Sequence, residues 1–171
     1  MTLLSDIEKI ATTTGLGDVV VEGLAHDEHA RYQFYLHALS VAPVASEREL
    51  IATILRDPDR IMAEAAVVGH IDRRASVLHS AKSFAEWGAQ IRDLVDPGGF
   101  IARRLNEWEL FKRVMAGETD SVDSLTDASD WLQRKVSEEA VTPEVLAKLA
   151  EYGRTKRVRN IAKSRSRALR R

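Results

Sequence analysis

The feature that most constrains this sequence is the recurrence of apolar residues at intervals of three and four positions along almost its whole length. This interval matches the period of the α-helix and places the apolar side chains on one face of each helix. Only Val19, Val20 and Val21 resemble a strand, and so short a run does not outweigh the helical pattern around it. The sequence therefore predicts an all-α fold.

Length and composition indicate the broad class of protein. The chain has 171 residues, of which 44% are hydrophobic and 30% charged, which is typical of one soluble domain and excludes collagen-like or wholly disordered chains. It has no cysteine, so disulfides, zinc ribbons, iron–sulfur sites and thiol nucleophiles are excluded. No apolar run is long enough to span a bilayer, and acidic residues stand where a signal peptide would be basic. We therefore expect a cytoplasmic protein without a transmembrane segment.

Capping residues and glycines predict where individual helices begin and end. Two Asp-Pro pairs, at Asp57 and Asp96, are predicted to cap helices, because aspartate accepts from free N–H groups and proline suits the first turn. Asp27 is predicted to cap a helix, and Ser46 to open the next one in a capping box with Glu49. Gly69 and Gly117 are predicted to end the helices after the Asp-Pro pairs. The first of those two helices is predicted to bury Ile61, Met62, Ala65, Ala66 and Val68.

Composition also divides the chain into four parts. Residues 1–116 are predicted to form a helical-repeat body, and residues 117–128, rich in Gly, Ser, Thr and acids, an acidic linker or loop. Residues 129–153 are predicted to form a C-terminal helical pair. Residues 154–171 form a basic tail that is predicted to be helical, with a thin apolar seam, or partly disordered.

Charge is distributed unevenly between the body and the tail. The net charge is -1, yet the tail carries nine basic residues and no acid, which leaves the body at -10. The tail cations are Arg154, Lys156, Arg157, Arg159, Lys163, Arg165, Arg167, Arg170 and Arg171. Such a block remains solvated or binds an anionic partner. Arg103, Arg104, Lys112 and Arg113 are predicted to extend the same phosphate- or partner-binding surface.

No motif assigns catalytic chemistry to this chain. The five histidines lack the spacing of a metal site, and the glycines lack the Lys-Ser/Thr of a phosphate-binding loop. Neighbouring carboxylates are typical of solvated helix faces. His70 and His79 are expected at helix ends or surfaces. We therefore expect no metal and no cofactor, and we assign no catalytic residue.

The two Asp-Pro pairs begin 39 residues apart, close to the period of about 40 residues in repeats of helical pairs. Residues 54–69 resemble a HEAT repeat in their Asp-Pro turn, small-residue helix face and closing glycine, although Met62 stands where a basic residue is usual. The resemblance covers about residues 18–116 and is specific over one repeat. It implies a short α-solenoid of HEAT-like helical pairs; an irregular orthogonal helical bundle would give the same pattern.

The function predicted from these features is a non-enzymatic module that binds a protein partner, with a second copy of the chain as one such partner. A first alternative is a nucleic-acid-binding protein whose basic tail contacts phosphates. As a second alternative, the HEAT-like resemblance implies a relation to DNA-base glycosylases. The aromatic and acidic residues that stand close enough in the sequence to serve such a site are Trp87 with Asp93 and Trp108 with Glu109. The acidic body disfavours a DNA-binding groove, however, and we expect both tryptophans in the core.

Overall fold

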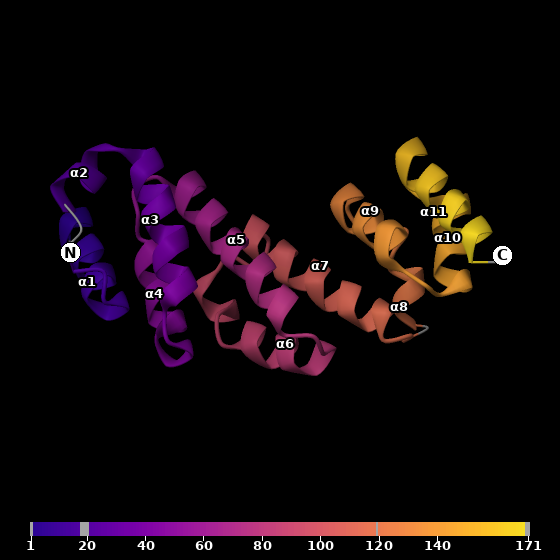
Figure 1. Cartoon of the computed structure of the whole chain (residues 1–171), viewed down its shortest axis with the longest axis horizontal. Helices are drawn as coiled ribbons and strands as arrows, with labels where there is room; N and C mark the ends of the chain where they lie inside the picture. Colours follow the sequence, from indigo (N-terminus) through magenta and orange to yellow (C-terminus); the bar gives the residue numbers. More distant parts are fainter. Residues whose placement is uncertain (1, 18–20, 119, 170–171) are drawn as a thin grey trace. The chain divides into compact units, whose positions relative to one another are not determined.

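The computed structural model describes residues 2–17, 21–118 and 120–169, and in these ranges it is helical, without a strand. The prediction of an all-α fold is confirmed. The chain forms two compact units (Figure 1): unit 1 comprises residues 1–77 and 86–104, and unit 2 comprises residues 78–85 and 105–171.

The elements follow one another along the chain with short connections. They are α1 (Leu3–Thr14), α2 (Val21–His26), α3 (Glu28–Val41), the 3₁₀ turn η1 (Val44–Ser46), α4 (Glu47–Ile54), α5 (Arg60–Val77), α6 (Ala81–Ala89), the 3₁₀ turn η2 (Arg92–Leu94), α7 (Phe100–Met115), α8 (Asp120–Asp123), α9 (Asp130–Glu139), α10 (Pro143–Tyr152) and α11 (Lys156–Ala168). In unit 1, α3 packs on α5, and α1 contacts α2, α3 and α4. In unit 2, α9, α10 and α11 pack together.

The predicted helix starts are only partly correct. Asp27 caps α3 and accepts a hydrogen bond from the Ala30 amide at 3.0 Å. Ser46 makes no side-chain cap bond, because η1 leads directly into α4 and gives Ser46 helical backbone angles. Asp96 also lies ahead of its helix and accepts from the Gly98 amide at 3.0 Å. The predicted capping bonds of Ser46 and Asp96 are therefore wrong, although α4 begins directly after Ser46 as predicted.

The prediction for the helix after Asp57 is wrong in its start and its end, and its buried face is only partly correct. Asp59, not Asp57, accepts from the Met62 amide at 3.0 Å and caps α5. Ala66 and Val68 are buried as predicted, but Ile61 is 85% exposed. The rest of the buried face is formed by Ala63, Val67, His70, Ile71 and Ala75. α5 continues through Gly69, where a Cβ atom would lie 3.2 Å from Leu36 Cδ2. Glycine thus allows close packing between α3 and α5, and a larger residue would require the Leu36 side chain to shift.

A buried ion pair holds the start of α3 to the turn before α5. The Asp57 carboxylate accepts from Arg31 Nε at 2.7 Å and from the Tyr35 hydroxyl at 2.8 Å. Both charged side chains are almost completely buried. Burial, together with the hydrogen bond to Asp57, raises the pKa of Tyr35 well above its usual range. Asp57 therefore fixes the position of α3 rather than capping α5.

A second buried polar cluster lies between α4, α5 and α6 within unit 1. Trp87 Nε1 donates to Glu47 Oε2 at 2.8 Å, and Arg74 Nε lies 3.3 Å from the same oxygen. His70 is 3% exposed, with Nε2 3.7 Å from Glu47 Oε1. The expectation that His70 lies at a surface is wrong, because the small residues of α5 bring its side chain against α4.

Unit 2 is built around an aromatic cluster. Trp108 lies edge-on to Phe111 and to Trp131, with ring centroids 5.3 and 5.4 Å apart. Segment 117–128 contains α8 and the fully buried side chain of Leu125. Trp108, like Trp87 of unit 1, is buried, so the expectation of two core tryptophans is confirmed.

Candidate functional site

The basic tail forms a regular helix, α11, that packs by one side. Thr155 caps the helix and accepts from the Val158 amide at 3.2 Å. Val158 and Ala162 are fully buried, one turn apart, where α11 contacts α9 and α10. The seam was predicted over Val158, Ile161, Ala162 and Leu169; Ile161 is half-buried, and Leu169 is 47% exposed. The prediction of a helical tail with an apolar seam is thus correct for Val158 and Ala162.

Gln133 of α9 fastens the beginning of α11. Its side chain is completely buried; Nε2 donates to the carbonyl oxygens of Leu125 at 2.7 Å and Thr126 at 3.0 Å. Its Oε1 accepts from the Arg154 amide at 2.7 Å. Sequence reasoning missed this residue, although a glutamine beside the apolar positions of α9 is a signal for a buried amide with specific partners.

The outward side of α11 is strongly cationic. Lys156, Arg157, Lys163 and Arg167 are exposed, and Asn160 and Ser164 lie among them; we call these six residues the basic face. In the described part of the chain, none of the four cations forms an ion pair. An open depression lies over Asn160, Lys163, Ser164 and Arg167.

The spacing on this face suits an extended anion. Lys156, Asn160, Lys163 and Arg167 recur every three or four positions, so their side chains form one stripe. With a rise of 1.5 Å per residue, this stripe is about 16 Å long. Lysine, arginine, asparagine and serine side chains all donate hydrogen bonds to phosphate oxygens. The basic face can therefore contact several phosphates in a row.

Two other tail cations serve the fold. Arg159 Nη1 donates to the Gly153 carbonyl at 2.6 Å, and Arg165 Nη2 donates to the Ala140 carbonyl at 3.0 Å. Both side chains are half-buried. Arg154 is exposed beside the first turn, and Arg170 and Arg171 lie outside the described residues.

The four cations predicted to extend the site do not form one surface. Arg104 and Lys112 are only 9% and 8% exposed, and Lys112 Nζ lies 5.6 Å from the Phe84 ring centroid. Burial, with repulsion from Lys135, lowers the pKa of Lys112. Arg113 is exposed but pairs with Glu118 at 2.7 Å. The prediction that Arg104 and Lys112 extend the binding surface is therefore wrong, because their buried side chains are not presented to a partner.

Arg103 is exposed and belongs to unit 1. It is thus the one member of this group that is both exposed and without an ion pair among the described residues.

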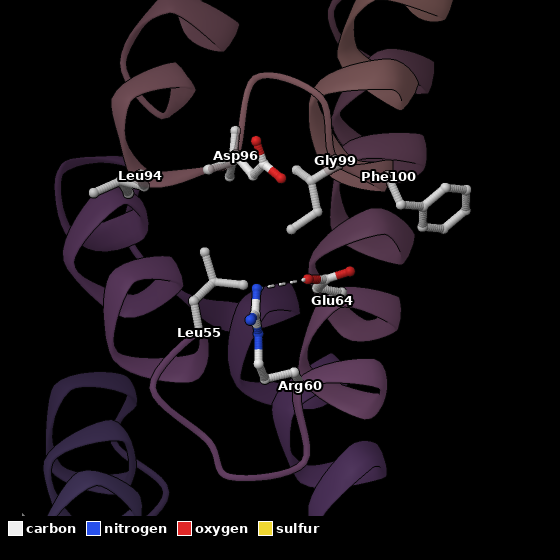
Figure 2. A pocket seen from close by; sticks show the side chains of 9 residues that line it. Leu55, Arg60, Glu64, Leu94, Asp96, Gly99 and Phe100 are labelled. Carbon is white, nitrogen blue, oxygen red and sulfur yellow. Dashed lines mark ion pairs between the residues drawn. The ribbon is translucent and has the colours of Figure 1, made fainter.

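A small cavity of about 90 Å³ lies in unit 1 near the beginnings of α5 and α7. Figure 2 shows Arg60 paired with Glu64 there, at 3.7 Å, with the Asp96 side chain nearby and the Phe100 ring pointing away. The space is enough for a few water molecules. The Arg60 cation is paired with Glu64, which leaves the Asp96 carboxylate as a second negative charge in the lining. The lining holds no hydroxyl, amine or imidazole side chain that could act as a nucleophile beside a base.

The aromatic–acid sets are occupied by structural contacts. Trp87 donates its indole N–H to Glu47, and Asp93 accepts from Arg48 Nη1 and Nη2, both at 2.7 Å. Trp108 lies in the aromatic cluster of unit 2. Across the described ranges, no three His, Asp or Glu side chains gather in a way that would hold a metal ion. No helix in these ranges has both the length and the apolar character to cross a membrane.

Comparison of the chain with protein-family models, with curated proteins and with solved structures found no match.

Proposed function

We propose that this chain is a non-enzymatic binding module that holds the phosphates of a nucleic acid against the basic face of α11. The observation that carries the proposal is the division of α11 into two sides. The seam of Val158 and Ala162 and the bonds of Gln133 hold the helix in place, while the four cations of the basic face have no ion pair in the described residues.

The composition of the basic face favours a nucleic acid over a protein surface. Protein interfaces depend on large buried anchors, above all aromatic residues and arginines in pockets. The basic face carries no large apolar or aromatic side chain. Contacts to phosphates need only cations and polar donors, and they carry no direct sequence information. We therefore expect binding with little sequence preference.

The structure also refines the expected strength of the salt dependence. Nine basic residues occur in the tail, but the basic face presents four cations. Each neutralised phosphate contributes about −0.9 to the slope of log K against log salt on duplex DNA. Four contacts thus predict a slope of about −3.6.

A salt series with a labelled mixed-sequence DNA duplex tests the proposal by fluorescence anisotropy. The variant K163Q/R167Q removes two cations from the basic face, so we expect weaker binding and a slope that is less steep by about 1.8. R73Q is the matched control, because Arg73 is an exposed cation of unit 1 without an ion pair in the described chain. R103Q tests the predicted extension of the site to Arg103.

Two outcomes would overturn the proposal. One is no binding at low salt; the other is binding that K163Q/R167Q and R73Q weaken equally. A polyglutamate competitor separates nucleic acid from acidic protein. If polyglutamate of equal charge displaces the duplex at equal concentration, the basic face is a general polyanion surface and the choice of nucleic acid is wrong.

The HEAT-like arrangement is likewise a proposal. The two Asp-Pro turns precede α5 and α7, the two longest helices in the described ranges. An experimental structure in which α4–α5 and α6–α7 superpose as helical pairs would support it, and two unrelated pair geometries would reject it in favour of an irregular bundle.

A further inference from the structure

A shallow apolar groove of about 370 Å³ lies between α3 and α5 within unit 1. Tyr32, Met62 and Ala65 contribute to its lining, and Ile61 at its side is 85% exposed. An isoleucine so exposed beside other apolar groups is unlike the single scattered apolar residues of most surfaces. We call this the α3–α5 groove.

The α3–α5 groove has an acidic rim. Glu28 and Asp59 both line it, and in the described part of the chain neither carboxylate has an ion pair with a cation. The pKa of Asp59 is lowered, chiefly by the hydrogen bond from the Met62 amide, with smaller contributions from a hydrogen bond with the Glu28 side chain and from attraction to Arg31. His29 and Tyr32 are the other titratable groups along the groove. The groove thus combines apolar contact area with negative charge near neutral pH.

The C-terminal end of α11 has the complementary character. Leu169 is 47% exposed directly after the last turn of the helix. Arg167 is exposed before it, and the sequence continues with Arg170 and Arg171. This segment offers one large apolar side chain among three arginines and no acid. An apolar side chain with flanking cations is what an apolar groove with two carboxylates on its rim would accommodate.

We propose that the α3–α5 groove binds the C-terminal end of α11 from a second copy of the chain. Leu169 would contact Ile61 and Met62, and the flanking arginines would pair with Glu28 and Asp59. Such contact joins two different surfaces, so it is head-to-tail and leaves one groove and one C-terminal end available in each pair. The inference does not depend on nucleic-acid binding.

Sedimentation velocity over a concentration series tests the proposal on the full chain. We expect the mean mass of the wild type to increase with concentration and to fall as salt is added. I61D and L169D should each remain monomeric, because each removes one side of the contact. Both positions are exposed, so neither change disturbs a buried core.

The decisive measurement is an equimolar mixture of I61D and L169D. In that mixture the intact groove of L169D meets the intact C-terminal end of I61D, so dimers should form, but nothing larger. V77D is the matched control, because Val77 is another exposed apolar residue of α5 that does not line the groove, and it should associate like the wild type.

A wild type that remains monomeric at its highest soluble concentration would overturn the proposal, as would equal behaviour of I61D and V77D. A mixture that stays monomeric would also overturn it. Because I61D leaves the basic face intact, its DNA binding reports on the proposed function separately. If the wild type binds DNA but does not associate, the groove proposal alone fails. If it associates but does not bind DNA, the proposed function alone fails.

Discussion

Unit 1 and α11 of unit 2 use charged residues in opposite ways. Unit 1 buries Arg31 and Asp57 as a hydrogen-bonded pair and surrounds Glu47 with the donors of Trp87 and Arg74. α11 instead buries apolar groups and exposes Lys163 and Arg167 without ion pairs in the described residues. The buried charges of unit 1 maintain the fold, whereas the exposed cations of α11 are presented to solvent.

The physical basis of this difference is the cost of removing a charge from water. A buried ion needs a partner at hydrogen-bonding distance, and loss of that partner leaves a large desolvation cost. An exposed cation keeps its hydration and contributes little to stability. Substitutions should therefore have large effects on stability in unit 1 and small ones on the basic face of α11.

The largest expected effect is that of Arg31→Met. This change leaves the Asp57 carboxylate buried without its cation, and we expect a loss of about 3–5 kcal/mol in the free energy of unfolding. Urea denaturation followed by circular dichroism would measure it. Adding Asp57→Asn should restore part of the stability, because it removes the unpaired charge. An R31M variant as stable as the wild type would show that the pair contributes nothing to the fold.

A smaller loss is expected for Gly153→Ala at the junction between α10 and α11. A Cβ atom there would clash with the Leu149 carbonyl oxygen and would lie 2.8 Å from Val158 Cγ1. We expect a loss of about 1–3 kcal/mol in unfolding free energy from overpacking. Gly17→Ala is the control, because nothing lies within 4 Å of a Cβ atom at Gly17. Equal unfolding midpoints in urea for the two variants would contradict the close packing around Gly153.

Glu47 makes the stability of unit 1 depend on pH. Burial alone would raise its pKa, but the hydrogen bond from Trp87 and the nearby side chains of His70 and Arg74 outweigh that cost and lower it below the ordinary value of 4.5. A lowered folded-state pKa stabilises the fold above pH 4.5, and this contribution is lost as pH falls further. The stability difference between wild type and E47Q should thus shrink below pH 4.5.

The measurement is a set of urea denaturation curves between neutral pH and pH 3 for both proteins. Glu49→Gln serves as the control, because Glu49 is exposed and its pKa is lowered mainly by Lys9. Salt should weaken the pH dependence contributed by Glu49 more than that contributed by Glu47. If the difference in unfolding free energy between wild type and E47Q stays constant with pH, the pKa of Glu47 is not lowered in the folded state.

The smallest stability effect is expected for K163Q/R167Q. Both side chains are exposed without ion pairs in the described chain, and glutamine is a good helix former, so unfolding free energy should change by less than about 0.5 kcal/mol. Thermal denaturation by circular dichroism would check this. A large loss of stability would mean that the basic face supports the fold, and the contrast with unit 1 would disappear.

Local patterns in the sequence predicted local features well. The all-α fold, the cap at Asp27 and the apolar seam of Val158 and Ala162 each depend on residues within a few positions of one another. Asp57 shows where this reasoning fails. Its position before a proline indicates a cap, but its partner Arg31 is 26 residues away, and no local pattern reports that pairing.

The candidate site was predictable in composition but not in arrangement. The sequence places nine cations in the tail, while the structure uses Arg159 and Arg165 to bind carbonyl oxygens. Arg104 lies in the part of α7 that belongs to unit 1, and Lys112 lies in the part that belongs to unit 2. The burial of each residue depends on packing within its own unit. The exposed Ile61 was also mispredicted, because apolar residues lie around much of α5 and the packing of α5 against α3, which no local pattern reports, decides which of them are buried.

The division of α11 into an attached side and a presented side has a consequence for how this protein can change over generations. Substitutions on the presented side are nearly neutral for stability, so charge there can be gained or lost one residue at a time while the chain continues to fold. Val158, Ala162 and Gln133 do not have this freedom, since each fills a completely buried position. Selection could thus adjust what the helix binds, and how tightly, without rebuilding the scaffold that carries it.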